Sequence, residues 1–328
     1  MRLLRGMPGV SLAGAYDLRR DVAERVAAEF GTRALPSLDA LAAEADAMVV
    51  AVPTVSHAEV GCRLLEGGLQ VLVEKPIAAD LASADRLVAS AGDRVLAVGH
   101  VEFYNPAVQA LLSARPDPRF VEIQRLSVFG LRSLDIDVIL DLMIHDLQIL
   151  HALDPSPVRE VRAAGVAVLS ERIDIANARV ELESGCVANL TASRVSAERV
   201  RRLRLFSRER YYSLDYQEQT LKGYRLETAP AGAPAVAAAG TAARIGSDDA
   251  AAGNSTGDRA AARDRRIVAL DLAVERAEPL RRELEAFVAA CRGERVEYVD
   301  GGAGRAALAT ALAIARAAAC GGGGGGRA

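Results

Sequence analysis

The sequence predicts an α/β fold in which a doubly wound parallel sheet is followed by an α+β domain with a large, mostly antiparallel open sheet. The first hundred residues alternate continuous apolar runs with amphipathic helix patterns, which is typical of a parallel sheet covered on both faces. Beyond residue 105, extended segments follow one another with few helices between them, which favours antiparallel pairing with one open face. A chain of 328 residues, 51% of them hydrophobic, is long enough for two cores.

Strand and helix patterns alternate in the N-terminal part. Apolar side chains at Leu18, Val22, Val26 and Phe30 recur every four residues, which is the apolar stripe of an amphipathic helix. We expect strands over residues 10–16, 47–52, 70–73 and 95–98, and helices over residues 18–30, 56–66 and 81–91.

The C-terminal part contains fewer helices and more extended segments. We expect helices over residues 107–113, 137–153, 279–291 and 304–319, and strands over residues 120–129, 158–169, 173–182, 186–194, 200–206, 211–216 and 267–274. Residues 229–265, rich in Ala, Gly, Ser and Asp without periodicity, are predicted to form a flexible insertion, and residues 321–328 a disordered glycine-rich tail. The predicted domains are therefore 1–104 and 105–320.

Composition and charge exclude several classes of protein. The formal net charge is -3 and no cluster of basic residues stands at either end, so nucleic-acid binding is not expected. No apolar run is long enough for a signal peptide or a membrane span, which predicts a cytoplasmic protein with no membrane contact. The four cysteines lack metal-site or disulfide spacing and are expected to be reduced thiols, with no structural metal; they are Cys62, Cys186, Cys291 and Cys320.

Lysine is nearly absent from this chain. Of 40 basic residues only Lys75 and Lys222 are lysine, so a lysine that remains is a candidate for a task that needs a compact ammonium with an adjustable pKa. Lys222 stands beside Gly223 in a predicted turn, where chance retention is the simpler interpretation. Lys75 follows a buried strand together with Glu74 and precedes Pro76, which stops the strand ladder. A solvated charge pair capping the strand is the competing interpretation.

Polar residues also follow two other strands of the predicted parallel sheet. Asp17 ends the strand over 10–16, where a dinucleotide fold places the carboxylate that accepts from the ribose hydroxyls, although Asp is equally common as a helix N-cap. Pro53 and Thr54 follow the strand over 47–52 and precede His57. These residues are expected at the carboxyl edge of the sheet, where nucleotides bind.

Asp141 and His145 form a candidate acid/base pair on the helix over 137–153. Their i,i+4 spacing puts the carboxylate and the imidazole on one helix face. A general base needs a pKa near working pH, which histidine has when unperturbed, and a neighbouring carboxylate can orient it and stabilise its protonated form. An Asp/His pair of this kind is structural in most proteins, so it needs a third partner.

The ordered motifs resemble the Gfo/Idh/MocA oxidoreductases. They are Tyr16-Asp17, the segment 51–57, Glu74-Lys75-Pro76, Gly99-His100, Asn105-Pro106-Ala107 and Asp141-x-x-x-His145, with a weaker similarity through 304–308. The resemblance implies an N-terminal Rossmann domain, a C-terminal domain built on a large open sheet, and a homodimer or homotetramer packed through that sheet. It also implies an NAD(P)-dependent dehydrogenase that acts on the hydroxyl of a sugar.

The same resemblance implies roles for individual residues. Lys75 contacts the reacting hydroxyl and the nicotinamide ribose, Asp141 positions the substrate, and His145 is the acid/base. The cofactor-binding set is Asp17, Pro53, Thr54, His57, Glu74, Lys75 and Pro76. Asp17 favours NAD because a carboxylate repels a 2'-phosphate, whereas Arg19 and Arg20 leave NADP open.

Three segments are further similar to a bacterial subgroup of UDP-N-acetylglucosamine 3-dehydrogenases of lipid A precursor synthesis, which supply a ketone to a partner aminotransferase. They are residues 135–147, 172–179 and 188–194. This similarity implies a nucleotide-sugar substrate, with Asn105 and Arg194 as weak candidates for binding it. Arg194, Arg199, Arg202 and Arg204 are able to meet a diphosphate bidentately; solvated arginines on a sheet face are the alternative.

The sequence departs from the family in two places. Phe103-Tyr104 stands where many relatives have an Arg before an aromatic residue, which puts one polar contact in doubt. Relatives also place a strand and a G-x-G-x-x-G turn ahead of the segment that matches residues 6–10. The sequence therefore predicts a Rossmann domain that lacks its first strand, with weak dinucleotide binding and low stability.

Three alternatives to a nucleotide-sugar dehydrogenase remain open. One is a non-catalytic dinucleotide- or sugar-binding member of the family, since a repressor shares this fold. Another is an inactive truncated product, and the last is a dehydrogenase of inositol or another polyol. The joint presence of Lys75, Asp141 and His145 favours an enzyme.

Overall fold

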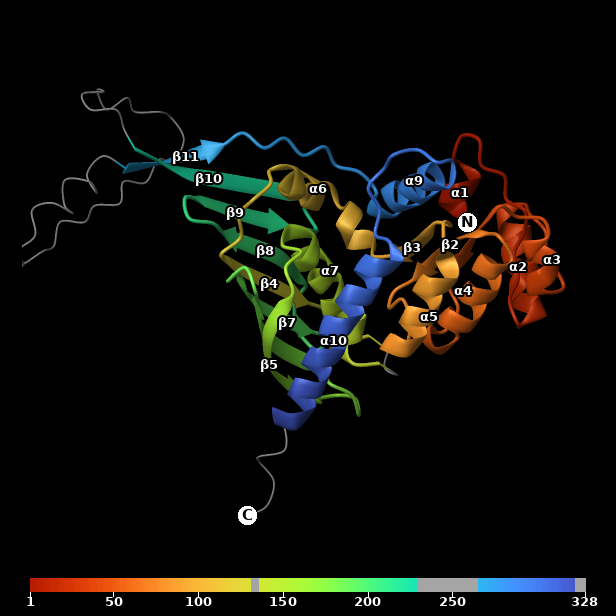
Figure 1. Cartoon of the computed structure of the whole chain (residues 1–328), viewed down its shortest axis with the longest axis horizontal. Coiled ribbons are helices and arrows are strands. Elements are labelled where there is room, and N and C mark those ends of the chain that lie inside the picture. Colours follow the sequence, from red (N-terminus) through yellow and green to blue (C-terminus); the bar gives the residue numbers. More distant parts are fainter. Residues whose placement is uncertain (131–135, 229–264, 322–328) are drawn as a thin grey trace, which may run out of the picture.

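The computed structural model describes residues 1–130, 136–228 and 265–321. Two sheets lie at opposite ends of the molecule, with helices between and around them (Figure 1). The predicted insertion over 229–265, except for Arg265, and the predicted tail after residue 321 lie outside the described residues.

The smaller sheet is parallel and has the order β1-β2-β3 among the described residues. Its strands are β1 (Ala47–Val50), β2 (Gln70–Glu74) and β3 (Leu96–Gly99). Val49, Leu72 and Ala97 share one row of the register. Val71 and Val73 of β2 are fully buried, as expected for a strand covered on both faces.

Short helices surround this sheet. They are α1 (Arg2–Arg5), α2 (Arg20–Phe30), α3 (Leu38–Ala42), α4 (His57–Glu66) and α5 (Leu81–Ala91), with 3₁₀ turns η1 (Thr54–Ser56) and η2 (Val101–Tyr104) after β1 and β3. Side-chain caps begin two of the helices: Ser37 accepts from the N–H of Ala40 and Asp80 from the N–H of Ser83. The alternating pattern of the sequence is therefore confirmed as an α/β arrangement.

The strand predicted over residues 10–16 is wrong. Only Ala15 forms a bridge, with Ala34, through the hydrogen bonds of Ala15 N–H to the Arg33 carbonyl and of Leu35 N–H to the Ala15 carbonyl. A strand needs a neighbour for its backbone groups, and β1 has a strand partner only in β2 within the described residues. The apolar run at 10–16 consequently stays outside the sheet.

The larger sheet has eight strands in the order β11-β10-β9-β8-β4-β7-β6-β5. The strands are β4 (Phe120–Leu126), β5 (Val158–Val166), β6 (Ile175–Leu182), β7 (Val187–Ser193), β8 (Val200–Phe206), β9 (Arg210–Asp215), β10 (Thr220–Thr228) and β11 (Arg265–Leu270). All neighbours are antiparallel except β4 and β7. This confirms the predicted mostly antiparallel sheet.

Helices cover one face of the larger sheet. α6 (Pro106–Ser113), α7 (Ile144–Leu153) and α10 (Gly301–Gly321) lie against it (Figure 1). Gly165 of β5 marks the closest approach, because a Cβ there would lie 3.1 Å from Cβ of Ala318 on α10. α10 is long and apolar enough to cross a membrane by composition, but Ala311 and Ile314 are fully buried in the protein core.

Lys222 lies in strand β10, so the turn predicted around it is wrong. A Cβ on Gly223 would lie 2.6 Å from Cδ1 of Leu272 and 3.0 Å from Cδ1 of Leu270. The absence of a side chain at Gly223 lets these two leucines pack against the backbone of β10, so the glycine does not mark a turn. Lys222 is exposed, while its neighbour Leu221 is buried.

The end of the chain returns to the smaller sheet. Leu284 and Phe287 of α9 (Pro279–Cys291) pack with Leu3, Leu72 and Ala97 in one apolar cluster. α10 contacts α5 and β3 as well as α7 and β5. The predicted boundary near residue 105 separates the two sheets. Since α9 comes from the C-terminal part but packs with the N-terminal part, the division into two domains at this boundary stays a prediction.

Candidate active site

The catalytic candidates meet at the carboxyl edge of the smaller sheet, where parallel folds bind their ligands. Lys75 comes directly after β2 and His100 directly after β3. Opposite them runs the segment η3 (Ile139–Met143), a π-helical turn that leads into α7. This segment carries Asp141 and His145.

Lys75 is held by Asp141. Its Nζ donates to the main-chain carbonyl oxygen of Asp141 at 2.6 Å and to the carboxylate Oδ1 at 3.1 Å. The two side chains are 18% and 20% exposed, so the pair is partly shielded from solvent. An ion pair of this kind is stronger than one on the open surface, and it fixes the ammonium at the carboxyl edge of the smaller sheet.

The predicted orientation of His145 by Asp141 is wrong. A π turn closes through i→i+5 hydrogen bonds and is wider than an α turn, so the i,i+4 geometry assumed from the sequence does not apply across η3. The Asp141 carboxylate turns to Lys75, and Nδ1 of His145 has no hydrogen-bond partner in the described part of the chain. The π turn is the local feature that separates the two side chains.

His145 lies in a cationic and enclosed environment. The residue is 9% exposed, and burial together with the charge of Lys75 holds the pKa of the imidazole well below 6.5. His100, which is fully buried, touches it edge-on with ring centroids 5.5 Å apart. His145 is therefore neutral at physiological pH, which is the form that accepts a proton.

A buried ion cluster beside His145 was missed by the sequence analysis. Arg125 of β4 makes a bidentate pair with Asp146, at 2.9 and 2.7 Å, and donates to Glu102 at 2.8 Å. Arg201 of β8 also donates to Glu102, at 3.1 Å. Burial raises the pKa of Glu102, but Arg125 and Arg201 outweigh it and hold that pKa below its usual range.

One sequence signal for this cluster was available. Val121, Ile123 and Arg125 stand at every second position of β4, and all three side chains lie on its buried face. An arginine therefore occupies a position where the alternation predicts an apolar core residue. A buried arginine requires acidic partners. The periodicity alone does not say that Glu102 and Asp146 supply them.

Asp17 lies two residues after the bridge residue Ala15, and its side chain is 40% exposed. Its Oδ1 accepts from the main-chain N–H of Arg19 at 2.8 Å, so it also stabilises the start of α2. Pro53 is exposed and Thr54 half-buried after β1. Asp17, Pro53 and Thr54 are therefore accessible to a ligand, and their role in cofactor binding stays a prediction.

His57 has a structural role, which corrects the prediction that its side chain binds cofactor. Its ring nitrogens lie 2.8 Å from the carbonyl oxygen of Pro76 and 2.9 Å from that of Val52, and the residue is 1% exposed. The imidazole thus ties the segment after β1 to the segment after β2. It holds Lys75 and Pro76 against the end of β1.

Glu74 is half-buried beside Gly99. A Cβ on Gly99 of β3 would lie 2.8 Å from the carboxylate Oε2 of Glu74 and 3.2 Å from its Cα, so a larger residue at this position would displace the Glu74 side chain. Burial raises the pKa of Glu74. The carboxylate of Glu283 on α9 is enclosed nearby, with Oε1 unpaired among the described residues, and burial together with the charge of Glu74 raises its pKa to about 8.

Asn105 and Arg194 are buried and bonded within the fold, which corrects their predicted role in substrate binding. Asn105 caps α6 by accepting from the N–H of Ala107, and its amide donates to the carbonyl of Tyr216. Arg194 is 5% exposed and donates to Asp174 at 2.7 Å and to the carbonyl of Ile136 at 2.8 Å. Both side chains are used within the fold.

The other arginines proposed for a diphosphate lie elsewhere. Arg202 pairs with Asp215 and Arg204 with Glu122 on the open face of the larger sheet. Strand alternation instead turns Arg201 toward the same face as Leu203 and Leu205, which are buried under the helices. Arg201 was not among the arginines predicted from the sequence to bind a diphosphate.

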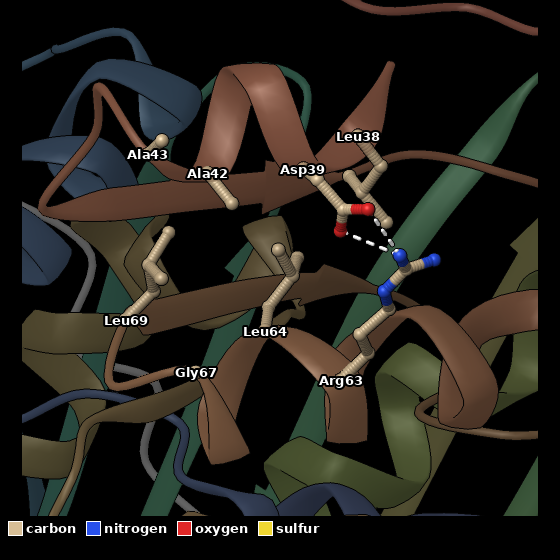
Figure 2. Close-up of a pocket in the computed structure, with 8 residues that line it drawn as sticks. All are labelled: Leu38, Asp39, Ala42, Ala43, Arg63, Leu64, Gly67 and Leu69. Atoms are coloured by element: carbon tan, nitrogen blue, oxygen red, sulfur yellow. Dashed lines mark hydrogen bonds and ion pairs between the residues drawn. The ribbon is translucent and has the colours of Figure 1, made fainter.

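Two hollows in the described residues lie outside this site, and the larger of them, of about 900 Å³, has His151, Glu297 and Asp300 in its lining. A hollow of about 210 Å³ lies between α3 and the end of α4, where Arg63 bridges to Asp39 (Figure 2). Apolar side chains such as Leu38, Leu64 and Leu69 line the rest of it. No three His, Cys, Asp or Glu side chains in the described ranges gather as a metal site.

Known proteins are similar to this chain in both sequence and fold. Residues 2–100 match the Gfo/Idh/MocA family, described as an oxidoreductase family with an NAD-binding Rossmann fold. UDP-N-acetylglucosamine 3-dehydrogenase of Acidithiobacillus ferrooxidans is 40% identical over 306 residues, which are 92% of this chain and 88% of that protein. The chain belongs to the Gfo/Idh/MocA family of oxidoreductases.

Solved structures share the fold of this chain. A structure of the Acidithiobacillus ferrooxidans enzyme has a TM-score of 0.77 at 38% identity and covers 93% of this chain and 89% of its own. The WlbA dehydrogenase of Bordetella pertussis, solved with NADH and UDP-GlcNAcA, has a TM-score of 0.69 at 18% identity over 96% and 90%. This second likeness shows the fold alone. The family confirms a dehydrogenase with a Rossmann-type, NAD-binding N-terminal domain and a C-terminal mixed sheet.

Proposed function

We propose that this chain oxidises the 3-hydroxyl of UDP-N-acetylglucosamine to a ketone with NAD. The observation that carries the proposal is the ammonium of Lys75, fixed by Asp141 at the sheet edge next to a neutral, buried His145. The substrate follows from the 40% identity to a UDP-N-acetylglucosamine 3-dehydrogenase. An inositol or polyol substrate finds no comparable support.

The residues of this chain divide the work of moving a proton. His145, neutral because of burial and the charge of Lys75, takes the proton of the substrate hydroxyl. Lys75 stabilises the developing negative charge on that oxygen, and Asp141 fixes the ammonium so that little reorganisation is needed. Bound NAD would supply the hydride acceptor.

The geometry around Asp17 favours NAD over NADP. Its carboxylate is available for ribose hydroxyls and repels a 2'-phosphate. Arg20, one of the two cations that would accept such a phosphate, is paired with Glu24 at 2.7 Å on the surface of α2. Pro53, Thr54, Glu74 and Pro76 complete the proposed cofactor edge, with Lys75 at its end.

Nucleotide-sugar oxidation is tested with the purified chain. We expect NADH formation from UDP-N-acetylglucosamine and NAD, and a product that mass spectrometry shows to have lost a pair of hydrogens. Free glucose and myo-inositol serve as controls and should give no NADH. Turnover of inositol without turnover of any UDP-sugar would place the chain in another branch of the family.

We also infer that the enzyme is a homodimer or homotetramer packed through the open face of the larger sheet. A row of aromatic rings crosses four strands of that face, at centroid spacings of 6.0, 4.9 and 6.1 Å. The row consists of Phe120, Phe206, Tyr211 and Tyr224. Light scattering of Phe206→Glu against the unchanged chain tests this, since a charge in the row should lower the assembly state.

The place of the reaction in the cell is a further part of the proposal. We infer a cytoplasmic enzyme of lipid A precursor synthesis, whose ketone is taken by a partner aminotransferase. Because a ketone next to an N-acetyl group is a suitable acceptor for amine transfer, the test adds an aminotransferase and an amino donor to the reaction. A 3-amino product supports this place, and a ketone that accumulates unchanged contradicts it.

A further inference from the structure

Two imidazoles are enclosed together at the active site. His100 is 0% exposed and His145 is 9% exposed, and their rings meet edge-on at an interplanar angle of 86°. Both nitrogens of His100 and Nδ1 of His145 are buried without a hydrogen-bond partner in the described residues. Of the four ring nitrogens, Nε2 of His145 is the one that is absent from this set of buried, unpaired atoms.

Leaving three buried nitrogens unpaired is costly. An unsatisfied buried polar group costs about 1–3 kcal/mol, and folded proteins seldom leave such groups without a partner. The ring centroids lie 5.5 Å apart, and no hydrogen bond joins the two rings as they stand. Reorientation of the rings would bring two nitrogens within hydrogen-bond reach, and one enclosed water would bridge them without it. The two rings are therefore suited to satisfy each other.

No carboxylate near His145 is available to take this place. Asp141 turns to Lys75, and both carboxylate oxygens of Asp146 accept from Arg125. The groups that act on the charge of His145 from the packed elements are cations and an imidazole: Lys75 after β2, His100 after β3, Arg125 on β4 and Arg201 on β8. The neutral imidazole of His100 is therefore the remaining candidate as hydrogen-bond partner for Nδ1 of His145.

We propose that His100 is a positioning residue that selects the tautomer of His145. His100 accepts the Nδ1–H of His145, directly or through one enclosed water, which leaves Nε2 of His145 unprotonated and free to take the proton of the hydroxyl. The proposal rests on the assignment of His145 as the base in the proposed function. It extends the set of positioning residues to the segment that follows β3.

His100 also fits this role by its own charge state. Burial and the charge of Lys75 lower the pKa of His100 to about 3, so the ring is neutral and keeps one unprotonated nitrogen as an acceptor. A second cation in this enclosure would be repelled by Lys75. Holding a histidine in the required tautomer is worth a large factor in other enzymes, where its loss lowers kcat by up to about 10⁴.

The tautomer of His145 is measured by ¹⁵N NMR of the ring nitrogens in the full chain at neutral pH. The chain has four histidines, and His145→Gln identifies the signals of His145. We expect the Nδ1–H form in the unchanged protein and the Nε2–H form to appear in His100→Phe, which keeps a ring but removes its nitrogens. The same variant should lower kcat by roughly 10- to 10³-fold, with KM for the sugar within a few-fold.

Two control variants separate positioning from packing. His100→Asn retains an oxygen acceptor and should keep the Nδ1–H form; it carries the test by itself if His100→Phe does not fold. His151→Gln removes another histidine of α7, which bonds Thr310 at 2.9 Å, and should leave the signals of His145 unchanged.

An unchanged tautomer in His100→Phe, or its loss in a folded His100→Asn, would overturn the proposal. The proposed function can fail independently. If no UDP-sugar is oxidised and yet the Nδ1–H form depends on His100, the substrate assignment is wrong and the positioning contact stands.

Discussion

Nζ of Lys75 lies closer to the main-chain carbonyl oxygen of Asp141, at 2.6 Å, than to its carboxylate, at 3.1 Å. The contact with the carbonyl is fixed by the backbone of η3 and is independent of the Asp141 rotamer. Two acceptors therefore define a position for a compact ammonium, in a site that is about four-fifths buried.

Lys75→Arg is expected to disable turnover although it retains the charge. The planar guanidinium is longer than the ammonium and cannot occupy the same point between the two oxygens. We expect kcat to fall by roughly 10²-fold or more, since misplacement of about 1 Å has effects of that size. Lys222→Arg is the matched control, because the other lysine of the chain is exposed on β10. Near-normal kcat for Lys75→Arg would show that charge alone matters there.

His145→Ala is expected to lower kcat by roughly 10²–10⁴-fold with the fold preserved. The pH profile of the unchanged enzyme adds a second measurement. The pKa of His145 is well below 6.5 because of burial and Lys75, so the base stays deprotonated as the pH falls through 6.5. The acid limb of kcat/KM should therefore lie below that pH. An acid limb centred at 6.5 or above would contradict the environment described for His145.

Periodicity and motif order predicted the fold because they report local burial. The helix expected over 81–91 and the strand over 200–206 agree with α5 and β8. Predictions failed where distant contacts decide the structure. Gly223 was expected in a turn, but it pairs with Tyr212 of β9 and Leu270 of β11, and Leu270 and Leu272 occupy the space that a Cβ would need. Residues 10–16 have strand composition but no strand neighbour in the described part of the chain.

The site was predictable in its residue types but not in its contacts. The scarcity of lysine pointed to Lys75. The predicted pairing of Asp141 with His145, by contrast, assumed α-helical i,i+4 geometry. The π turn of η3 redirects Asp141 to Lys75, and no sequence rule places such a turn. The predicted role of Arg194 failed for another reason. Its partner Asp174 is twenty residues away, directly before β6, and Arg194 directly follows the neighbouring strand β7, so the ion pair is set by sheet topology.

Arg194→Ala should destabilise the protein strongly. Asp174 is fully buried and would lose the guanidinium that donates to it at 2.7 Å, and breaking a buried ion pair costs about 3–5 kcal/mol. Arg202→Ala on the exposed face of the same sheet loses a pair with Asp215 at 3.4 Å and should cost about 0–1 kcal/mol. Urea denaturation of both variants measures the difference. Similar free energies of unfolding for the two variants would show that Asp174 is satisfied without Arg194.

Glu283→Gln should change how stability depends on pH. Glu283 is 2% exposed, and burial together with the charge of Glu74 raises its pKa to about 8 from the model-compound value of 4.5. The folded protein therefore binds a proton that the unfolded chain has released between these two pH values. Linkage makes the stability from this group fully present below pH 4.5, and it is lost as pH rises toward 8.

The Gln variant has no carboxyl group to titrate at this position. Its free energy of unfolding, compared with that of the unchanged protein, is therefore expected to increase as pH rises. The growth between pH 4.5 and 7.5 should reach up to about 4 kcal/mol, at 1.36 kcal/mol for each pH unit. Glu285→Gln is the matched control, because Glu285 lies on the same helix, is exposed and pairs with Arg281 at 3.5 Å. Urea denaturation across that pH range measures the slope, which is independent of any constant cost of burying the amide. Parallel slopes for Glu283→Gln and the unchanged chain would mean that Glu283 is ionised in the folded protein, with a partner for its carboxylate that the described residues do not supply.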